Sequence, residues 1–243
     1  MLKKLTNIIL SIALLLASSI ASASLITNGS FEQVTFADNS TSQGIVHQTD
    51  LQNFARKKRG WDVFTTLPGW VTTAGNGIEL QKNIVTKSTD GQQHVELDSH
   101  RRGASNTVMT QTLNSLTIGA DYLLEFSYKP RTNKKNDNGI NVFWYDAATN
   151  FDLDMTANFA INGRSKKNKN WTVQSILLTA QSETMALSFG AFGKQNGLGG
   201  LLDNISLVKV NNGLVTDIPE PSVFALSMLA FTLLVRRQHN KSK

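Results

Sequence analysis

The sequence contains no cysteine and only four histidines among its 243 residues. The absence of cysteine excludes a disulfide framework, a Cys-ligated zinc site, an iron–sulfur cluster and a thiol nucleophile. Four histidines are too few for a His-rich metal site. The sequence also lacks Gly-x-Ser-x-Gly, His-Glu-x-x-His, a phosphate-binding loop and a dinucleotide fingerprint, so it indicates none of these enzyme classes. Hydrophobic residues make up 40% of the chain, which is enough for a folded core.

The N-terminus has the three parts of a secretory signal peptide. Residues 1–4 (Met-Leu-Lys-Lys) form a basic start, residues 5–20 are apolar, and Ala21-Ser22-Ala23 is a small-residue cleavage site. This pattern predicts export, with cleavage after Ala23. The alternative is that the apolar run is retained as a membrane anchor.

The C-terminus is equally organised. Fourteen mainly apolar residues, 222–235, lie between an extended tripeptide and a basic pair, namely Pro219, Glu220, Pro221 and Arg236, Arg237. This apolar run is short for a membrane span, which needs about 20 residues. The basic residues favour the cytoplasmic side of a membrane. The prolines keep the preceding backbone extended, which suits the grip of a processing enzyme.

These C-terminal residues resemble the PEP-CTERM sorting signal of Gram-negative bacteria, with the three parts in the right order at the end of the chain. The resemblance covers residues 219–243. It implies a short hydrophobic sorting helix, recognition by an exosortase, and transient contact with the inner membrane. It also implies delivery to the cell surface or the extracellular matrix, often alongside exopolysaccharide. The alternative is a tail-anchored protein with a chance Pro-Glu-Pro.

The net charge of +6 comes mostly from these two ends. Six of the 24 Lys and Arg and one of the 18 Asp and Glu lie there, so residues 24–218 carry a net charge of only +1. A nucleic-acid partner therefore loses its main support. Basic clusters remain at residues 56–59 and 164–169. They are either solvated loops or contacts for an acidic polysaccharide or for lipopolysaccharide phosphates.

Between the ends, alternation of apolar and polar residues predicts an all-β domain. Tyr122, Leu124, Phe126 and Tyr128 are expected on one face of a strand, and Leu201, Asp203, Ile205 and Leu207 on one face of another. In a third strand, Ile140, Val142 and Trp144 oppose Asn141, Phe143 and Tyr145. Many short strands and no amphipathic helix favour a β-sandwich or jelly roll.

The predicted organisation has five segments. They are a signal peptide (1–23), a β-sandwich domain (24–210), a polar insertion loop within it (37–60), a linker (211–218) and the sorting signal (219–243).

The order of several short motifs resembles the galactose-binding-like β-sandwich found in many carbohydrate-binding modules. The motifs are Asn-Gly-Ser-Phe-Glu (28–32), Leu-Pro-Gly-Trp (67–70), Gly-Gln-Gln-His-Val-Glu-Leu (91–97), Met-Thr-Gln (109–111) and Leu-Asp-Asn-Ile-Ser-Leu (202–207). The resemblance implies a structural Ca²⁺ ion joining the first and last strands, with Glu32 and Asp203 as ligands. Calcium prefers six to eight oxygen ligands, some of which would be backbone carbonyls. The alternative is that Glu32 caps a turn and Asp203 ends a strand in solvent.

Sugar-binding sites combine an aromatic platform with a few hydrogen-bonding groups. The candidate ligand-binding residues are Trp70, Glu96, Asn141, Trp144 and Tyr145. Since neighbouring residues of a strand point to opposite faces, one of Trp144 and Tyr145 must point away from the core. The preferred patch is Asn141 and Tyr145 with the adjacent loop at residues 136–138.

A catalytic site is the less favoured interpretation. His94, Glu96 and Asp98 alternate and would line one face of a strand, where two carboxylates could serve glycoside hydrolysis. The sequence as a whole predicts an exported surface or matrix protein that binds carbohydrate. The alternatives are a structural matrix or envelope protein that acts by protein–protein contact and, less favoured, a polysaccharide-modifying enzyme.

Overall fold

The structure is a computed structural model that describes residues 23–36, 44–47, 60–100, 103–134, 136–162 and 170–210. The chain divides into two compact units, Met1–Val210 and Asn211–Lys243, and all described residues belong to the first. Apart from Ala23, the predicted signal peptide, both basic clusters, the linker and the sorting segment lie outside the described residues. Within the described part, no helix is long and apolar enough to cross a membrane.

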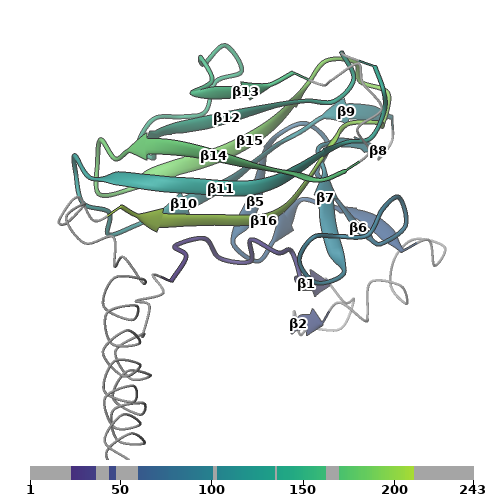
Figure 1. Cartoon of the computed structure of the whole chain (residues 1–243), viewed down its shortest axis with the longest axis horizontal. Helices are drawn as coiled ribbons and strands as arrows, with labels where there is room; N and C mark the ends of the chain where they lie inside the picture. The colour runs from purple at the N-terminus through teal and green to yellow at the C-terminus, as the bar shows by residue number, and fades with distance from the viewer. Residues whose placement is uncertain are drawn as a thin grey trace, which may run out of the picture. The chain divides into compact units, whose positions relative to one another are not determined.

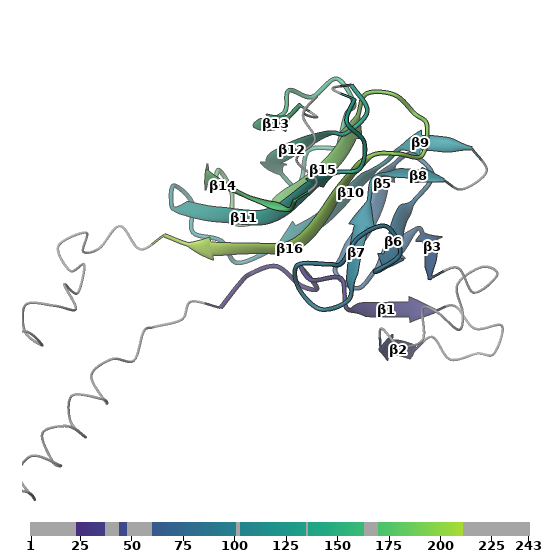
Figure 2. The same ribbon diagram turned by 45° about the vertical axis from the view of Figure 1, so that its right-hand side comes forward.

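Every regular element of the described residues is a β-strand, which confirms the all-β prediction. Sheet I has six strands in the order β13 (Phe159–Ile161), β12 (Gly139–Asp146), β15 (Met185–Phe192), β10 (Val108–Leu113), β5 (Trp70–Ala74) and β4 (Thr66–Leu67). Sheet II has six strands in the order β14 (Thr172–Thr179), β11 (Asp121–Pro130), β16 (Gly200–Lys209), β7 (Gln93–Glu96), β6 (Ile78–Lys82) and β3 (Trp61–Phe64). The two sheets form the two layers of a sandwich (Figures 1 and 2).

Two short ribbons complete the described fold. Strands β8 (Asp98–His100) and β9 (Ala104–Asn106) pair antiparallel, as do β1 (Gln33–Phe36) and β2 (Gly44–His47). Strand β2 lies inside the segment 37–60 that was predicted as a polar loop, so part of that insertion pairs with the first strand.

The predicted alternation is confirmed in two central strands. Tyr122, Leu124, Phe126 and Tyr128 of β11 all point into the core. In β12, Ile140, Val142 and Trp144 point into the core, so Asn141 and Tyr145 lie on the outer face of sheet I.

The prediction for β16 was wrong because of a β-bulge. Opposite β11, the register shifts so that Glu125 pairs with Ser206 but Ser127 pairs with Asp203. Asn204, with a φ of 49°, lies in the extra stretch. The bulge reverses the alternation, so Ile205 and Leu207 face the core while Asp203 faces outward.

Trp70 is at the centre of the core and is 0% exposed. Its ring centroid lies 6.0 Å from that of Phe31 and 6.0 Å from that of Phe189, and Phe189 stacks edge-on against Phe126 at 5.1 Å. Phe189 belongs to sheet I and Phe126 to sheet II, so these contacts join the two layers. The Trp70 indole N–H donates to the carbonyl of Asn28 at 3.3 Å, which ties the N-terminal segment to the core.

The N-terminal segment gives a stability prediction at Gly29. A Cβ at this position would lie 1.9 Å from the backbone oxygen of Ile205, whose N–H donates to the Gly29 carbonyl. Backbone must therefore move, and we expect Gly29→Ala to lower the free energy of unfolding by about 2–4 kcal/mol. Gly119→Ala is the matched control, since φ is +76° but nothing lies within 4 Å of its Cβ. We expect it to cost about 1 kcal/mol. Equal losses in urea denaturation would contradict the close approach.

Candidate functional site

Two of the predicted ligand-binding aromatics are core residues. Trp70 is fully buried, and Trp144 is 6% exposed with its indole N–H donating to the Thr179 carbonyl at 2.9 Å. Both occupy inward positions of their strands, where Trp70 contacts the ring of Phe189. Neither ring is available to a ligand, which corrects the expectation for these two residues.

Glu96, the predicted polar ligand contact, is buried in a cluster on the outer face of sheet II. It is 0% exposed and pairs directly with Glu79 across β7 and β6. The Gln81 amide bridges the two acids, donating to Glu79 Oε1 at 2.8 Å and to Glu96 Oε2 at 2.6 Å. Arg131 forms an ion pair with Glu96. We call Glu79, Gln81, His94, Glu96 and Arg131 the acid cluster.

The acid cluster holds a neighbouring loop. Glu96 Oε1 accepts the N–H of Gly199 at 2.6 Å. Asp98 Oδ2 accepts the N–H groups of Asn196, Gly197 and Leu198 at 2.8, 2.8 and 3.2 Å. The carboxylates of Glu96 and Asp98 therefore hold the turn that leads into β16. They do not form a solvent-facing catalytic pair.

Burial controls the ionisation of this cluster. Desolvation raises the pKa of Glu96 to about 8, against the lowering effect of the Arg131 charge and with a further rise from Glu79. Desolvation also raises the pKa of Glu79. The pKa of His94 falls to about 4, first through burial and then through the charges of Lys129 and Arg131. These shifts resemble those of catalytic groups, but the Glu96 carboxyl is fully buried and cannot contact a substrate as the chain is folded.

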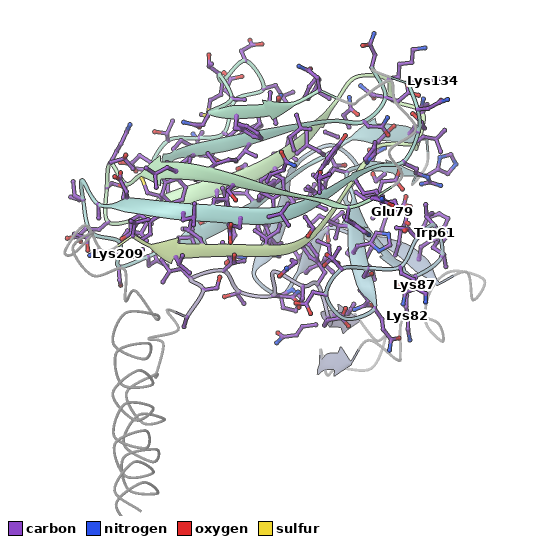
Figure 3. The ribbon with its side chains drawn as sticks, viewed as in Figure 1. Trp61, Glu79, Lys82, Lys87, Lys134 and Lys209 are labelled. Atoms are coloured by element: carbon purple, nitrogen blue, oxygen red, sulfur yellow. The ribbon has the colours of Figure 1, made fainter. Side chains whose placement is uncertain are left out.

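His94 is likewise enclosed. Its Nδ1 lies 2.9 Å from Ser88 Oγ, its Nε2 lies 3.3 Å from Gln81 Oε1, and its ring meets Trp171 edge-on at 5.6 Å. Figure 3 shows Glu79, Trp61 and Lys87 at one end of the sandwich, far from Lys209 at the other. This end of sheet II is rich in charge and closed by its own side chains.

The predicted calcium ligands hold one turn, residues 89–93, from two sides. Glu32 Oε1 accepts the N–H groups of Gln92 and Gln93, both at 2.7 Å. Asp203 Oδ2 accepts the N–H of Thr89 at 2.6 Å, the Thr89 hydroxyl at 3.0 Å and the N–H of Asp90 at 3.0 Å. Desolvation raises the pKa of Asp203 to about 6 despite these bonds.

The same residues fit a calcium ion only in part. Asp203 Oδ1 accepts the Asn204 N–H at 2.8 Å, so both of its oxygens already have N–H donors. Glu32 Oε2 and Gln93 Oε1, by contrast, are buried without a hydrogen-bond partner among the described residues. No three His, Asp or Glu side chains of the described chain converge in a metal-binding arrangement. Calcium therefore stays a prediction, with Glu32 rather than Asp203 as the available carboxylate.

The outer face of sheet I carries the open candidate site. Four hydroxyl groups on four adjacent strands form a hydrogen-bonded row across it: Thr73 (β5), Thr110 (β10), Ser188 (β15) and Tyr145 (β12). Thr110 and Ser188 oxygens are 2.7 Å apart, and Ser188 and Tyr145 oxygens are 3.1 Å apart. The two inner hydroxyls are buried, while Thr73 is exposed and Tyr145 is half-buried.

Beside the row lies an aromatic group. Phe151 stacks edge-on against Phe143 at 5.2 Å and lies tilted at 6.0 Å from Tyr145. Phe143 lies against Gly190, where an added Cβ would be 3.3 Å from its ring. Phe143 is buried, whereas Tyr145 and Phe151 remain half-exposed. We call Thr73, Asn141, Tyr145 and Phe151, with the hydroxyls beneath them, the Tyr145 face.

The loop expected to join this patch has a different role. Asn138 is fully buried, and its Oδ1 accepts the N–H groups of Arg131 and Thr132, both at 2.9 Å. Its side-chain amide donates to the Lys134 carbonyl at 3.0 Å. Asn138 therefore builds the turn between β11 and β12, and the accessible part of the predicted patch is Asn141 and Tyr145.

Sequence reasoning missed Phe151 and the three other hydroxyls of the row. The available signal was the presence of hydroxyl residues within short apolar runs, as at Thr110 and Ser188. Which strands are neighbours depends on the sheet order, and the side of the sheet covered by the loop 147–158 depends on tertiary folding. Neither follows from periodicity.

Comparison with known proteins gives distant likenesses. No family model matches the sequence. A multifunctional-autoprocessing repeats-in-toxin from Vibrio vulnificus is 27% identical over 139 residues, which cover 56% of this chain and 2% of the toxin. The chain thus spans about one fiftieth of the length of that curated relative.

Structural neighbours include carbohydrate-binding modules. TmCBM61 in complex with β-1,4-galactotriose is 14% identical with a TM-score of 0.40, covering 58% of this chain and 88% of that one. The cleaved adhesin domain of Lys-gingipain from Porphyromonas gingivalis is 17% identical with a TM-score of 0.44, covering 63% and 98%. What this chain binds has to follow from its own residues.

The acid cluster predicts a pH dependence of stability. The folded-state pKa of Glu96, about 8, exceeds its ordinary value of 4.5, so the fold favours the protonated carboxyl. The contribution of Glu96 to the free energy of unfolding is therefore complete below about pH 4.5 and is lost as the pH rises through 8. We expect the melting temperature to fall between about pH 6.5 and about pH 8.5, above the range in which His94 has the opposite effect, and to fall less in Glu96→Gln. His94 is present in both proteins, so its opposite effect at low pH cancels. If the melting temperatures of the two proteins fell equally over this pH range, the raised pKa of Glu96 would be contradicted.

The turn at residues 89–93 predicts different calcium responses of its two acids. Asp203→Ala removes an oxygen that accepts three hydrogen bonds, so we expect a lower melting temperature in calcium and in chelator alike. Glu32→Gln keeps an acceptor for the turn and removes the free carboxylate oxygen, so its loss is expected only in calcium. Differential scanning calorimetry with calcium and with EGTA checks both. A calcium-dependent loss in Asp203→Ala would place the ion on Asp203 instead.

Proposed function

We propose that this protein binds carbohydrate through the Tyr145 face and is exported to the cell surface or matrix. The observation that carries the proposal is the Tyr145 ring, which is held by Ser188 at its hydroxyl and by Phe151 at its side. An aromatic ring with neighbouring hydroxyl and amide groups is the usual means of holding a sugar, since the apolar face of the sugar stacks on the ring.

The fixed position of the ring favours affinity. A side chain that is already ordered loses little conformational freedom when a ligand binds. Thr73, an exposed residue whose hydroxyl is hydrogen-bonded to Thr110, and the half-buried Asn141 supply the remaining contacts. We assign the domain to the galactose-binding-like β-sandwiches on the basis of its motif order and its two antiparallel layers.

The export route rests on the sequence. The signal peptide at residues 1–23 would direct secretion, and residues 219–243 would be recognised by an exosortase after transient contact with the inner membrane of a Gram-negative bacterium. A bound Ca²⁺ at Glu32 would stabilise the turn at residues 89–93 and take no direct part in binding the sugar.

A structural role in the matrix is the second candidate, and one surface favours it. On the outer face of sheet II, Leu177, Leu123 and Val208 stand directly opposite one another on three adjacent strands. Leu177 is 59% exposed, and Val173 on the same strand is 66% exposed. Exposed apolar rows on an edge strand favour protein–protein contact. Catalysis has less support, because Glu96 is sealed from solvent.

Binding should depend on the Tyr145 ring rather than on its hydroxyl. We expect Tyr145→Ala to weaken retention on a bound polysaccharide at least about tenfold, because stacking area is lost. Tyr145→Phe keeps the ring, and we expect a loss within about threefold. Leu177→Ala on the other sheet is the matched control, with unchanged retention. Affinity electrophoresis on a panel of polysaccharides measures all three. Loss of binding in Leu177→Ala but not in Tyr145→Ala would place the polysaccharide on sheet II, and retention of none of the polysaccharides by the folded wild type would favour the structural role.

The sorting proposal is tested in the cell. Deletion of residues 219–243 should release the protein into the medium, because the segment that an exosortase would grip is gone. Immunoblots of fractionated cells give the distribution, and exchange of Arg236 and Arg237 for lysine serves as a control that keeps the charge. A truncated protein that remains in the envelope would rule out sorting by this segment.

A further inference from the structure

The two outer faces of the sandwich differ sharply in charge. The outer face of sheet II carries the acid cluster together with Glu125, Lys129 and Asp203. On sheet I, the outward positions of the four central strands carry no charged residue: Val71 and Thr73; Val108, Thr110 and Thr112; Ala186, Ser188, Gly190 and Phe192; Asn141, Phe143 and Tyr145. Among the described strands, the charged outward positions therefore lie on sheet II and not on the four central strands of sheet I.

The segment that carries Phe151 is acidic. Residues 139–162, which include β12, β13 and the loop between them, contain no lysine or arginine. The same segment contains Asp146, Asp152 and Asp154, and it carries Phe151. Asp146 and Asp152 each accept a hydrogen bond from a backbone N–H two residues later, at 2.8 and 3.0 Å. These turns fix the aspartates in the loop that carries the aromatic platform.

From these observations we infer that the ligand of the Tyr145 face is an uncharged polysaccharide. This inference rests on the proposed carbohydrate-binding function. A uronate, sulfate or phosphate group placed on this face would lose water without gaining an opposite charge, which is costly. Asp152 and Asp154, in the loop that carries Phe151, would repel it as well. Hydroxyl groups of a neutral sugar, by contrast, match Thr73 and Asn141, and its apolar ring face matches Tyr145 and Phe151.

The ligand is also an extended chain rather than a single sugar. The hydroxyl row crosses four adjacent strands, which at about 4.8 Å per step spans about 14 Å. The accessible members, Tyr145 and Thr73, lie at the two ends of the row. Thr110 and Ser188 lie between them and are buried. A ligand that contacts both ends must run across the strands over several linked units.

The test compares three polymers with the full chain: a soluble neutral β-glucan or β-galactan, alginate as the acidic polymer and chitosan as the cationic one. We expect retention on a neutral polymer, unchanged within about twofold from low salt to about 0.5 M NaCl, since no charge contacts the ligand. Tyr145→Ala should abolish it. Monosaccharides should compete poorly, and oligosaccharides of increasing length should compete better.

A charge-altered variant distinguishes the absence of charge on the ligand from carbohydrate binding itself. Asp154→Lys keeps the Asp152 hydrogen bond to the backbone N–H of residue 154. It should leave neutral binding unchanged and add retention on alginate, because a repulsive charge is replaced by an attractive one. Salt-sensitive binding of wild type to alginate or chitosan that needs Tyr145 would overturn the inference of an uncharged ligand while leaving carbohydrate binding intact. If the wild-type protein bound none of the polymers while its circular dichroism melt showed that it is folded, both the uncharged ligand and carbohydrate binding would be overturned.

Discussion

The burial of apolar side chains between two six-stranded sheets is the constraint on which the rest of the structure depends. Each strand can offer only every second residue to this core, so every inward position fixes what its neighbours present outside. Trp144 fills the core, and Tyr145 therefore stands on the outer face. The Trp70–Phe189–Phe126 contacts hold the two layers at one spacing, which makes both outer faces rigid.

The two outer faces use this rigidity differently. Sheet II places Glu79, Gln81 and Glu96 on its outer side and then closes over them with Arg131 and the loop before β16. Charges enclosed in this way organise turns and make stability depend on pH. Sheet I keeps its outer face uncharged and leaves Tyr145 and its neighbours accessible. The acid cluster on sheet II is thus enclosed by its own neighbours, and the uncharged face of sheet I is the candidate for binding.

The sequence predicted the all-β class, the inward residues of β11 and β12, and the outward placement of Asn141 and Tyr145, because each depends only on alternation. It did not predict the inversion within β16, which requires the bulge at Asn204. It also favoured Trp70 and Glu96 as ligand contacts, since residue type does not reveal burial. The hydroxyl row could not be found, because Thr73, Thr110, Ser188 and Tyr145 become neighbours only through the order of the strands. Asp203 was predicted as a calcium ligand, and its carboxylate accepts the backbone N–H groups of Thr89, Asp90 and Asn204 and the Thr89 hydroxyl.

The central claim is that the Tyr145 face, and not the charged face, receives the polysaccharide. Hydrogen–deuterium exchange of the full chain with and without a bound neutral polymer tests it most directly. The account predicts slower exchange in the loop at residues 147–158 and at the end of β12, with unchanged exchange at residues 84–92 and in β14. Slower exchange at residues 84–92 or in β14, with none in the loop that carries Phe151, would contradict it.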